Sequence, residues 1–459
     1  EILCRSVDGR LLSATPAPSR APPFTVEPPM SELAATSGLA PLTRPGSILV
    51  IGAGIIGRCC ALQLARQGHA ITLLDDDAGL QAPSWGNAGH IAIEQTSPLA
   101  SPTHVRQAWS RWYRRGGPMD IRRPWSIAPW LGRFLRASRA ETHTRGQAVL
   151  RALLADAMPA WQRLDALLPG PPQILPHGHL VVWESATSAT AGYTRWQQAD
   201  TGESRLRTLY PQEHLELARH LGTAGPSLQG IGFEGSAQIR DPRQLAAALD
   251  AALASHGVRR ANSNVLGLVH RGSHTVAVTV DGEQPRHDRT LVCAGVRSAP
   301  LLTDLGETVP LVAERGYHLQ WSQHQWPDSL PPVVFEDRSV ILTRFDSGLR
   351  LAGFVEFAPR DTPPDRGKWQ RLAMHAKALG LPVQGEPRTW MGARPTLPDY
   401  LPALGYASRA PDVLYAIGHQ HLGLTLAATT AELVGCQLQG QALPDWLPAL
   451  ALSRFKHAW

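Results

Sequence analysis

The stretch ILVIGAGIIGRCCALQLARQGHAITLLDDD, residues 48–77, contains the pattern that decides the fold of this chain. Gly52, Gly54 and Gly57 have the spacing G-x-G-x-x-G, directly after a run of β-branched and apolar residues. The first glycine permits a tight turn, the second lets the backbone approach a pyrophosphate, and the third lets helix and strand pack closely. The pattern therefore predicts a strand, a glycine turn and a helix whose free N–H groups receive phosphate.

The predicted second strand, AITLLD, ends at an acidic residue, Asp75. An acid about 20 residues after the glycine turn is the residue type that binds the ribose hydroxyls of a dinucleotide. Asp76 and Asp77 follow directly, so the identity of the ribose ligand is open by one residue. Three adjacent acids would repel the 2′-phosphate of NADP, which leaves NAD and FAD as the dinucleotides to consider.

Length and composition are those of an ordinary globular protein. The chain has 459 residues, of which 43% are hydrophobic and 18% charged, enough for two or three domains. Its net charge of +6 is too small to indicate nucleic-acid binding. No apolar run reaches the roughly 18 residues of a membrane-spanning helix. The five cysteines show no metal-binding spacing, so we expect no metal site and a reducing, cytoplasmic location.

The order of apolar patterns predicts an α/β protein of two domains, the first of them discontinuous. Buried strands linked by helices occur in three segments, 46–100, 230–305 and 395–445, which we assign to the first domain. Helical stretches and amphipathic strands occupy 101–229 and 306–394. We assign these two segments to a second domain with a mixed or antiparallel sheet.

The first 45 residues differ from the rest of the chain. Residues 1–45 are rich in Pro, Ser, Ala and Thr and lack apolar periodicity, a composition that predicts disorder. They also lack the apolar core of a signal peptide. Because Met30 is the first methionine, we interpret residues 1–29 as an artefactual extension ahead of the natural start.

Four further motifs lie outside the glycine turn: SWGNAGHIA (84–92), TLVCAGVRSAPLL (290–302), GARPTLPDYLPALG (392–405) and LYAIGHQHLGLTLAATTAELV (414–434). In order and spacing they resemble the FAD-dependent D-amino-acid oxidase superfamily, most nearly its bacterial D-amino-acid dehydrogenases. The resemblance covers roughly residues 46–440. It implies a Rossmann-like FAD-binding domain of the D-amino-acid oxidase and glutathione-reductase type, joined to a substrate domain, with FAD as the cofactor.

The resemblance also implies which residues bind FAD. The three turn glycines would bind the pyrophosphate, Asp75 the ribose, and the backbone of Val265 the adenine region. The loop that begins at Ser84 would lie beside the flavin ring. The last helix would start at Gly423, so that its N–H groups face the N1–C2 edge of the ring, which is anionic in reduced flavin. The full set is Gly52, Gly54, Gly57, Asp75, Ser84, Asn87, Ala88, Gly89, Val265, Gly295, Gly423, Leu424 and Thr425.

The catalytic residues that the resemblance implies lie far from the glycine turn. Arg394, in GARP, matches the family's arginine for the substrate carboxylate, and a guanidinium binds a carboxylate in two places at once. A structural ion pair is the alternative for Arg394. His419 stands at a position that is often His in the family, and Tyr317 is expected to cover the pocket. His90 either lines the site or satisfies backbone groups.

These residues together predict an FAD-dependent D-amino-acid dehydrogenase. Hydride passes from the substrate Cα to flavin N5, the imine hydrolyses, and a quinone or a partner electron-transfer protein takes the electrons instead of oxygen. The D-amino acid itself is open, and a cyclic one such as D-proline or cis-4-hydroxy-D-proline suits this chemistry. Two alternatives stay open: a glycine or sarcosine oxidase that uses oxygen, and a flavin-binding subunit of a larger electron-transfer complex.

The stretch 105–139 is rich in arginine and tryptophan. Tryptophan at lipid headgroups and arginine on anionic lipid would give a peripheral contact with the inner membrane. A solvated helical excursion or a subunit interface is the alternative interpretation.

Overall fold

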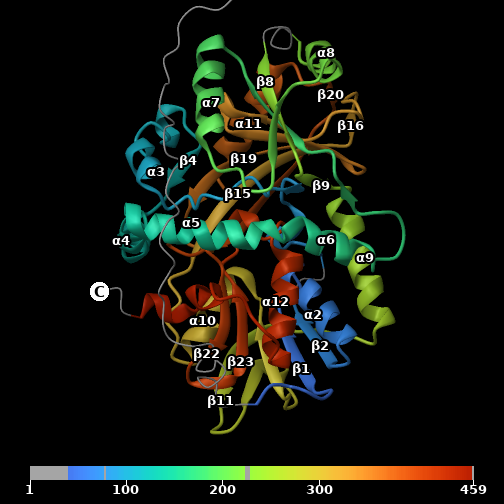
Figure 1. The fold of residues 1–459 in the computed structure, drawn as a ribbon, viewed down its shortest axis with the longest axis vertical. Helices are drawn as coiled ribbons and strands as arrows, with labels where there is room; N and C mark the ends of the chain where they lie inside the picture. Colours follow the sequence, from blue (N-terminus) through green and yellow to red (C-terminus); the bar gives the residue numbers. More distant parts are fainter. Residues whose placement is uncertain (1–39, 77–78, 223–227, 457–459) are drawn as a thin grey trace, which may run out of the picture.

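The computed structural model describes residues 40–76, 79–222 and 228–456, in which two large sheets lie one above the other (Figure 1). Most of the stretch 1–45 lies outside the described residues, and so does Asp77.

The lower sheet has six strands in the order β10-β2-β1-β14-β23-β22. Every pairing is parallel except the one between β23 and β22. All three segments that the sequence assigns to the first domain contribute strands. The bounds are β1 (Ser47–Ile51), β2 (Ala70–Asp75), β10 (Arg259–Asn262), β14 (Arg289–Val292), β22 (Ala403–Ala407) and β23 (Ala410–Ile417).

The lower sheet is covered on both faces, which explains why most of its strands are continuous apolar runs. Ile48 and Val50 pack into one core with several helices, and Leu49 and Ile51 pack into another with a small sheet and a short helix. The helices of the first core include α2 (Ile55–Arg66), α9 (Pro242–Ser255) and α12 (Ala427–Gln439). The small sheet is β11 (Val265–His270), β12 (Thr275–Thr279) and β13 (Gly282–Glu283), and the short helix is α10 (Ser298–Thr303).

The upper sheet is mixed, as the sequence predicts. Its order is β21-β15-β19-β18-β17-β6-β8-β7, with β4 beside β19, and the pairings β17–β6 and β19–β4 are parallel while the others are antiparallel. Its strands are β4 (Met119–Ile121), β6 (His179–Trp183), β7 (Arg205–Thr208), β8 (Gln229–Glu234), β15 (Val312–Trp321), β17 (Val333–Phe335), β18 (Val340–Phe345), β19 (Gly348–Phe357) and β21 (Arg388–Thr396). Helices α7 (Ala186–Gln198), α8 (Pro211–His220) and α11 (Arg366–Leu379) lie around it (Figure 1).

Two helices cross the molecule between the sheets (Figure 1). They are α5 (Ala140–Ala155) and α6 (Ala157–Asp165), and the indole N–H of the fully buried Trp161 on α6 donates to the carbonyl of Leu424 at 2.9 Å. The remaining elements are α3 (Pro102–Gln107), α4 (Ala128–Ala137), β3 (His90–Ile91), β5 (Ile174–Leu175), β9 (Ala237–Ile239), β16 (Gln323–His324) and β20 (Val383–Gln384).

The last helix begins later than the sequence predicts, and this corrects the assignment of its first turn. The 3₁₀ turn Gln420–Leu422 is followed by a turn, and α12 begins only at Ala427. The N–H of Ala427 donates to the carbonyl of Leu424 at 3.3 Å, three residues back, so the chain is wound more tightly here than an α-helix. Gly423, Leu424 and Thr425 therefore precede the helix instead of starting it.

Candidate functional site

One cavity of about 1390 Å³ connects the loops of the lower sheet with a face of the upper sheet. It is lined at one end by the glycine turn that follows β1 and at the other by residues of β6, β15, β18, β19 and β21. The segment that precedes α12 also lines it. Nearly all the residues proposed from the sequence therefore border a single space, although the farthest two, Gly52 and Leu424, are 372 residues apart in the chain.

The glycine turn is shaped by close backbone approach. A Cβ atom added at Gly57 would lie 1.7 Å from the carbonyl oxygen of Gly52, and one added at Gly52 would lie 2.5 Å from the carbonyl oxygen of Cys293. Gly52 also has a φ of +104°, which favours glycine. A Cβ atom at Gly54 would meet only the Ser84 hydroxyl, at 3.3 Å, and Gly54 lines the cavity. The turn thus brings bare backbone to the cavity wall.

The part of the cavity next to the glycine turn is lined by two acidic residues and by backbone that borders open space. The carboxylate of Asp75 accepts the N–H of Ala53 and so holds the end of β2 against the turn. Asp76 forms an ion pair with Arg297. Gly295 has a φ of +57° and no atom within 4 Å of its would-be side chain, so the backbone borders open space. Asn264 and Val265 line the same region.

The loop that the resemblance places beside the flavin ring is held by its own hydrogen bonds. Asn87 donates from Nδ2 to the Ser84 carbonyl at 2.7 Å and accepts the Gly89 N–H on Oδ1 at 2.8 Å. Arg350 donates to the Asn87 carbonyl, and Thr343 donates to the Ala88 carbonyl at 2.8 Å. The Ser84 hydroxyl accepts the N–H of Ile55, the first residue of α2, at 3.0 Å. The loop is therefore fixed to α2 and to the upper sheet.

Two histidines lie just before α12, the buried His419 and the partly buried His421. Nε2 of His419 lies 3.0 Å from the Thr430 hydroxyl oxygen. Nε2 of His421 lies 2.7 Å from Oε1 of Gln95. Burial lowers the pKa of both to about 3, so each ring is neutral near pH 7. The Thr425 hydroxyl accepts the N–H of Ala92 at 2.9 Å, which joins this segment to the loop beside the ring.

Arg394 faces the cavity from β21 and has one carboxylate partner. Its side chain lies over Gly316 of β15, where an added Cβ would be 2.2 Å from the Arg394 Nη2 atom. Its Nη1 lies 3.2 Å from Oε1 of the buried Glu314, whose other oxygen accepts from the hydroxyls of Thr396 and Tyr400. The side chain is 28% exposed. The ion pair thus occupies one edge of the guanidinium and leaves donors toward the cavity.

Tyr317 borders the cavity but its hydroxyl is engaged elsewhere. It lies on the same face of β15 as Arg315, opposite to Gly316, because side chains alternate along a strand. Its hydroxyl donates to Glu356 at 2.9 Å and accepts the N–H of Asp365 at 3.2 Å. Burial raises its pKa to about 12. The hydroxyl of Tyr317 is therefore held by Glu356 and Asp365, and its role in covering the pocket stays a prediction.

Arg111 is a cavity residue that the sequence interpretation placed in the arginine-rich surface stretch. It follows α3 and lines the cavity, and burial lowers its pKa. Within the described ranges its guanidinium has no hydrogen bond or ion pair. Arg111 and Arg394 both line the cavity, and both lower the pKa of Tyr400 against the larger effect of burial, which raises it. Only the folded chain distinguishes Arg111 from its exposed neighbours.

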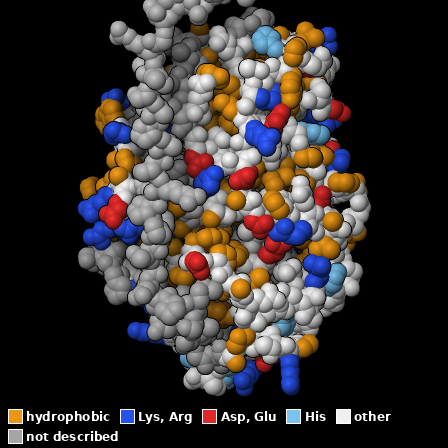
Figure 2. Space-filling view, viewed as in Figure 1, with side chains coloured by type: hydrophobic (Ala, Val, Ile, Leu, Met, Phe, Trp, Pro, Cys, Tyr) orange, Lys and Arg blue, Asp and Glu red, His pale blue; other side chains and the backbone are white. Residues whose placement is uncertain are grey.

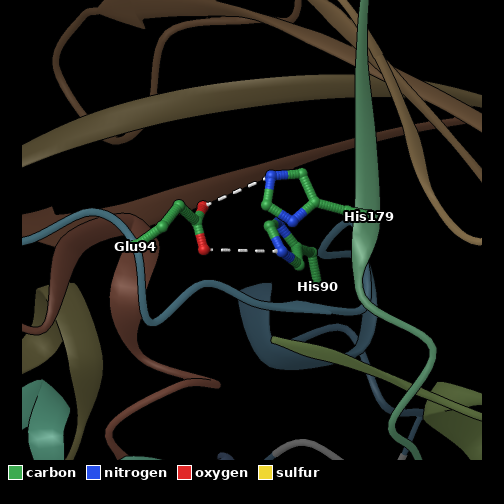
Figure 3. Close-up of side chains that lie close together, drawn as sticks. All are labelled: His90, Glu94 and His179. Atoms are coloured by element: carbon green, nitrogen blue, oxygen red, sulfur yellow. Dashed lines mark ion pairs between the residues drawn. The ribbon is translucent and has the colours of Figure 1, made fainter. Parts of the chain in front are cut away.

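His90, which lies on β3, is buried beside two residues that the sequence gave no reason to single out. Figure 3 shows His90, Glu94 and His179 directed toward one another. Nε2 of His90 lies 3.9 Å from Oε2 of Glu94, and Nε2 of His179 lies 3.8 Å from Oε1. Burial raises the pKa of Glu94 to about 8, lowers that of His90 to about 4, and lowers that of His179 well below its ordinary value.

The first end of the cavity fits a dinucleotide. Gly52 and Gly57 have no room for a side chain, Gly54 lines the cavity beside the Ser84 hydroxyl, and Gly295 presents backbone to open space. A pyrophosphate needs such close backbone approach at the start of a helix. The cavity continues past this end along the loop Ser84–Gly89 to β21, so a dinucleotide bound at the turn would extend toward the upper sheet.

Comparison with known proteins identifies the family. Residues 47–437 match the model of the DAO family, described as FAD dependent oxidoreductase. A D-amino-acid oxidase of Bradyrhizobium diazoefficiens is 31% identical over 431 residues, which are 89% of this chain and 98% of that protein. A D-amino acid dehydrogenase 2 of Ralstonia nicotianae is 26% identical over 427 residues, which are 89% and 99%. The structure of iminodiacetate oxidase from Chelativorans sp. BNC1 has a TM-score of 0.67 at 21% identity, covering 88% of this chain and 98% of that one.

This chain belongs to the DAO family of FAD-dependent oxidoreductases. The predicted family, the fold class, the enzyme class and the cofactor FAD are confirmed. Among the described residues, no helix has the length and apolar character needed to cross a membrane.

Proposed function

We propose that this FAD-dependent oxidoreductase oxidises the amine of a D-amino acid. The observation that carries the proposal is the cavity that runs from the glycine turn to Arg394, so that a carboxylate held by this arginine lies in the same space as the cofactor. The relatives named D-amino-acid oxidase and D-amino acid dehydrogenase 2, each matched over 89% of the chain, support the substrate class. FAD, when bound, accepts a hydride from the substrate Cα at N5.

The protein's own residues would position the substrate. Arg394 keeps donors for the carboxylate while Glu314 holds its orientation, and Arg111 adds a second positive charge to the same region. Because His419 and His421 are neutral, they add no charge that competes for the carboxylate. FAD and substrate, when bound, would displace water from the cavity, which strengthens the charge interactions inside.

The residues proposed for FAD divide between its two halves. Gly52, Gly54 and Gly57 would hold the pyrophosphate, Asp75 the ribose and Val265 the adenine region, with Gly295 beside them. Ser84, Asn87, Ala88 and Gly89 would hold one side of the flavin ring, and the turn Gly423, Leu424 and Thr425 the other. Because α12 begins only at Ala427, the turn N–H groups rather than a helix terminus would meet the N1–C2 edge.

Anaerobic mixing of the purified holoenzyme with a panel of D- and L-amino acids tests the substrate class. The panel includes glycine, sarcosine, D-proline and cis-4-hydroxy-D-proline, and bleaching of the flavin absorbance is followed. We expect bleaching by at least one D-amino acid and not by its L-enantiomer. Bleaching by L-amino acids alone, or by none of the panel, contradicts the proposal.

For the electron acceptor we propose a quinone or an electron-transfer protein. The second candidate, an oxidase that uses oxygen, is favoured by the relative named D-amino-acid oxidase, which is 31% identical. Turnover with a quinone analogue but without hydrogen peroxide supports the first. Stoichiometric hydrogen peroxide in air, at the rate of amino-acid loss, supports the second.

We also propose a peripheral contact of this enzyme with an anionic membrane on the cytoplasmic side. Trp125 is 87% exposed and Trp109 is 66% exposed. Arg114, Arg115 and Arg123 are exposed in the same stretch. Co-sedimentation with vesicles that contain anionic lipid, lost at high salt and in Trp125→Ser, is the expected result. No co-sedimentation at low salt contradicts the contact.

A further inference from the structure

Three buried side chains on the cavity wall form a cluster outside the positions discussed for FAD and the substrate carboxylate. His90 lies on β3, Glu94 follows it in the chain, and His179 is the first residue of β6. Figure 3 shows the two imidazoles directed at the two oxygens of one carboxylate. The chain thus brings two nitrogen ligands and one oxygen ligand together from segments 85 residues apart.

The distances in the cluster fit an ion better than hydrogen bonds. The two N···O separations, 3.9 Å and 3.8 Å, exceed the reach of a hydrogen bond. One ligand atom from each residue lies within 4.8 Å of the others. A tetrahedral ion with bonds of about 2.0–2.1 Å holds its ligand atoms roughly 3.4 Å apart. The two N···O separations exceed this spacing by about half an ångström, so the three side chains would draw together around an ion.

The polar atoms at the centre of the cluster lack partners. Among the described residues, Nε2 of His90 and Oε2 of Glu94 are buried and accept or donate no hydrogen bond. Both side chains are almost fully enclosed, 7% and 2% exposed. Buried polar atoms in folded proteins are nearly always satisfied, and the exceptions call for a bound water or ion. These two atoms point at each other across the same gap.

The orientation of His179 supports a role as ligand. Its Nδ1 lies 2.8 Å from the Ser236 hydroxyl, and its ring stacks on Phe233 with the centroids 4.5 Å apart. A histidine that binds a metal through one nitrogen usually has its other nitrogen in a hydrogen bond, which fixes the ring. Nε2 of His179 is in this way directed at Glu94.

In a second cluster, of three carboxylates, a lysine of the protein already occupies the centre. Asp120, Glu356 and Asp365 also converge. There the ammonium of Lys368 lies 2.7, 2.5 and 3.0 Å from the three carboxylates, so a cation of the protein itself fills the centre. The described side chains place no such cation between His90, Glu94 and His179.

We propose that His90, Glu94 and His179 bind one divalent transition-metal ion, with Zn²⁺ as its representative. Two imidazoles and one carboxylate suit Zn²⁺ and its neighbours in the first transition series, and they do not suit Mg²⁺ or Ca²⁺, which take oxygen ligands. All three residues line the cavity, so an ion reaches them from that side and water or a substrate atom completes its coordination. The site is independent of which amine the enzyme oxidises.

Metal binding by the holoenzyme tests the site. The FAD-loaded protein is first dialysed against a chelator and then titrated with Zn²⁺, and bound metal is measured by calorimetry and elemental analysis. We expect one tight equivalent per chain, which excess Mg²⁺ does not displace. Glu94→Gln and His179→Gln should weaken binding by more than about 100-fold, and Ser236→Ala by about 10- to 100-fold, the usual loss when an outer partner is removed.

Two controls keep the result decisive. His270→Gln changes a histidine that lies 3.6 Å from a carboxylate elsewhere, and it should bind zinc like the wild type. X-ray absorption at the zinc edge of the wild type needs no variant to fold: nitrogen and oxygen ligands at about 2.0–2.1 Å are expected. A sulfur shell at about 2.3 Å would assign the metal to the cysteines. That shell, the absence of a tight equivalent, or its retention in both ligand variants would overturn the site.

Discussion

The two ends of the cavity differ in what lines them, which is mainly backbone at one end and side chains at the other. The end at Gly52–Gly57 is shaped mainly by backbone that approaches other backbone, with the Asp75 carboxylate holding the N–H of Ala53. The end at Arg394 is made of charged and polar side chains from several distant segments. The first end should therefore tolerate no added volume, and the second should respond to charge. Substitutions that change only the volume or only the charge of a side chain therefore distinguish the two ends of the cavity.

Gly57→Ala should have the largest effect. The added Cβ would lie 1.7 Å from the Gly52 carbonyl oxygen, so the turn must open and the pyrophosphate site is lost. We expect purified protein without bound FAD, measured as flavin released per chain on denaturation. Gly132→Ala on α4 is the matched control, because nothing lies within 4 Å of its Cβ position. One FAD per chain in Gly57→Ala would contradict the steric argument.

Arg394→Met should lower kcat/KM for the amino acid by about 10- to 150-fold and leave the FAD content unchanged. This range corresponds to the roughly 1.5–3 kcal/mol of a charged hydrogen bond. The change should appear mainly in KM, and Arg394→Lys should recover part of it. Steady-state kinetics over a range of substrate concentrations measure it.

The ion-pair alternative for Arg394 predicts a different result. If its only role is to pair with Glu314, Arg394→Met lowers Tm because a buried carboxylate loses its cation, and KM stays near the wild-type value. Glu314→Gln separates the two roles further, since it keeps the shape and removes the charge.

Arg111→Met should lower kcat/KM less than Arg394→Met does. It should also differ from Arg394→Met in its effect on stability. A loss of about tenfold in kcat/KM is expected if the guanidinium assists carboxylate binding. Because no described residue pairs with this partly buried cation, its removal should leave Tm unchanged or raise it. Thermal unfolding of the pair Arg111→Met and Arg394→Met shows whether the two arginines differ in this way; a similar fall in Tm for both would contradict it.

The smallest effect concerns His318, which joins the two ends. Its Nδ1 donates to the Gly86 carbonyl at 2.9 Å, and its ring stacks on Trp390 with the centroids 5.0 Å apart. Burial lowers its pKa to about 3, so below about pH 6.5 the unfolded chain binds the proton first and the folded state loses stability. One such histidine lowers the free energy of unfolding by about 1 kcal/mol at pH 6.

His318→Gln should flatten this pH dependence. The free energy of unfolding should fall less steeply between pH 6.5 and 5 than in the wild type, although the variant is less stable at pH 7. Denaturant titrations at several pH values measure the slope. An unchanged slope would mean that His318 is not neutral in the folded protein.

The sequence predicts the end of the cavity at the glycine turn better than the end at Arg394. The glycine turn is a local pattern, so its strand, helix and acid at Asp75 follow from neighbouring residues. Tyr317 lies on a strand with both faces buried, and alternation alone does not say which face meets the cavity.

Other residues depend on packing that the sequence does not express. Glu94 and His179 have no shared spacing, and only the approach of β6 to β3 brings them together. Arg111 has the same residue type as its exposed neighbours. The late start of α12 depends on a turn that Trp161, about 260 residues earlier, contacts through the carbonyls of Leu424 and Thr425.

The order of strands in the lower sheet has a consequence for synthesis on the ribosome. β14 lies between β1 and β23, so the sheet under the glycine turn is complete only when Val413 has emerged. At about 5–20 residues per second, roughly 20 to 70 seconds separate the emergence of Asp75 from that of Val413. For the first part of this interval β2 lacks its neighbour β10 and β1 lacks its neighbour β14, and β14 then lacks β23 until the end. The nascent chain therefore exposes a growing apolar sheet edge, first at β1 and β2 and then at β14, and we expect cofactor loading to come late in synthesis.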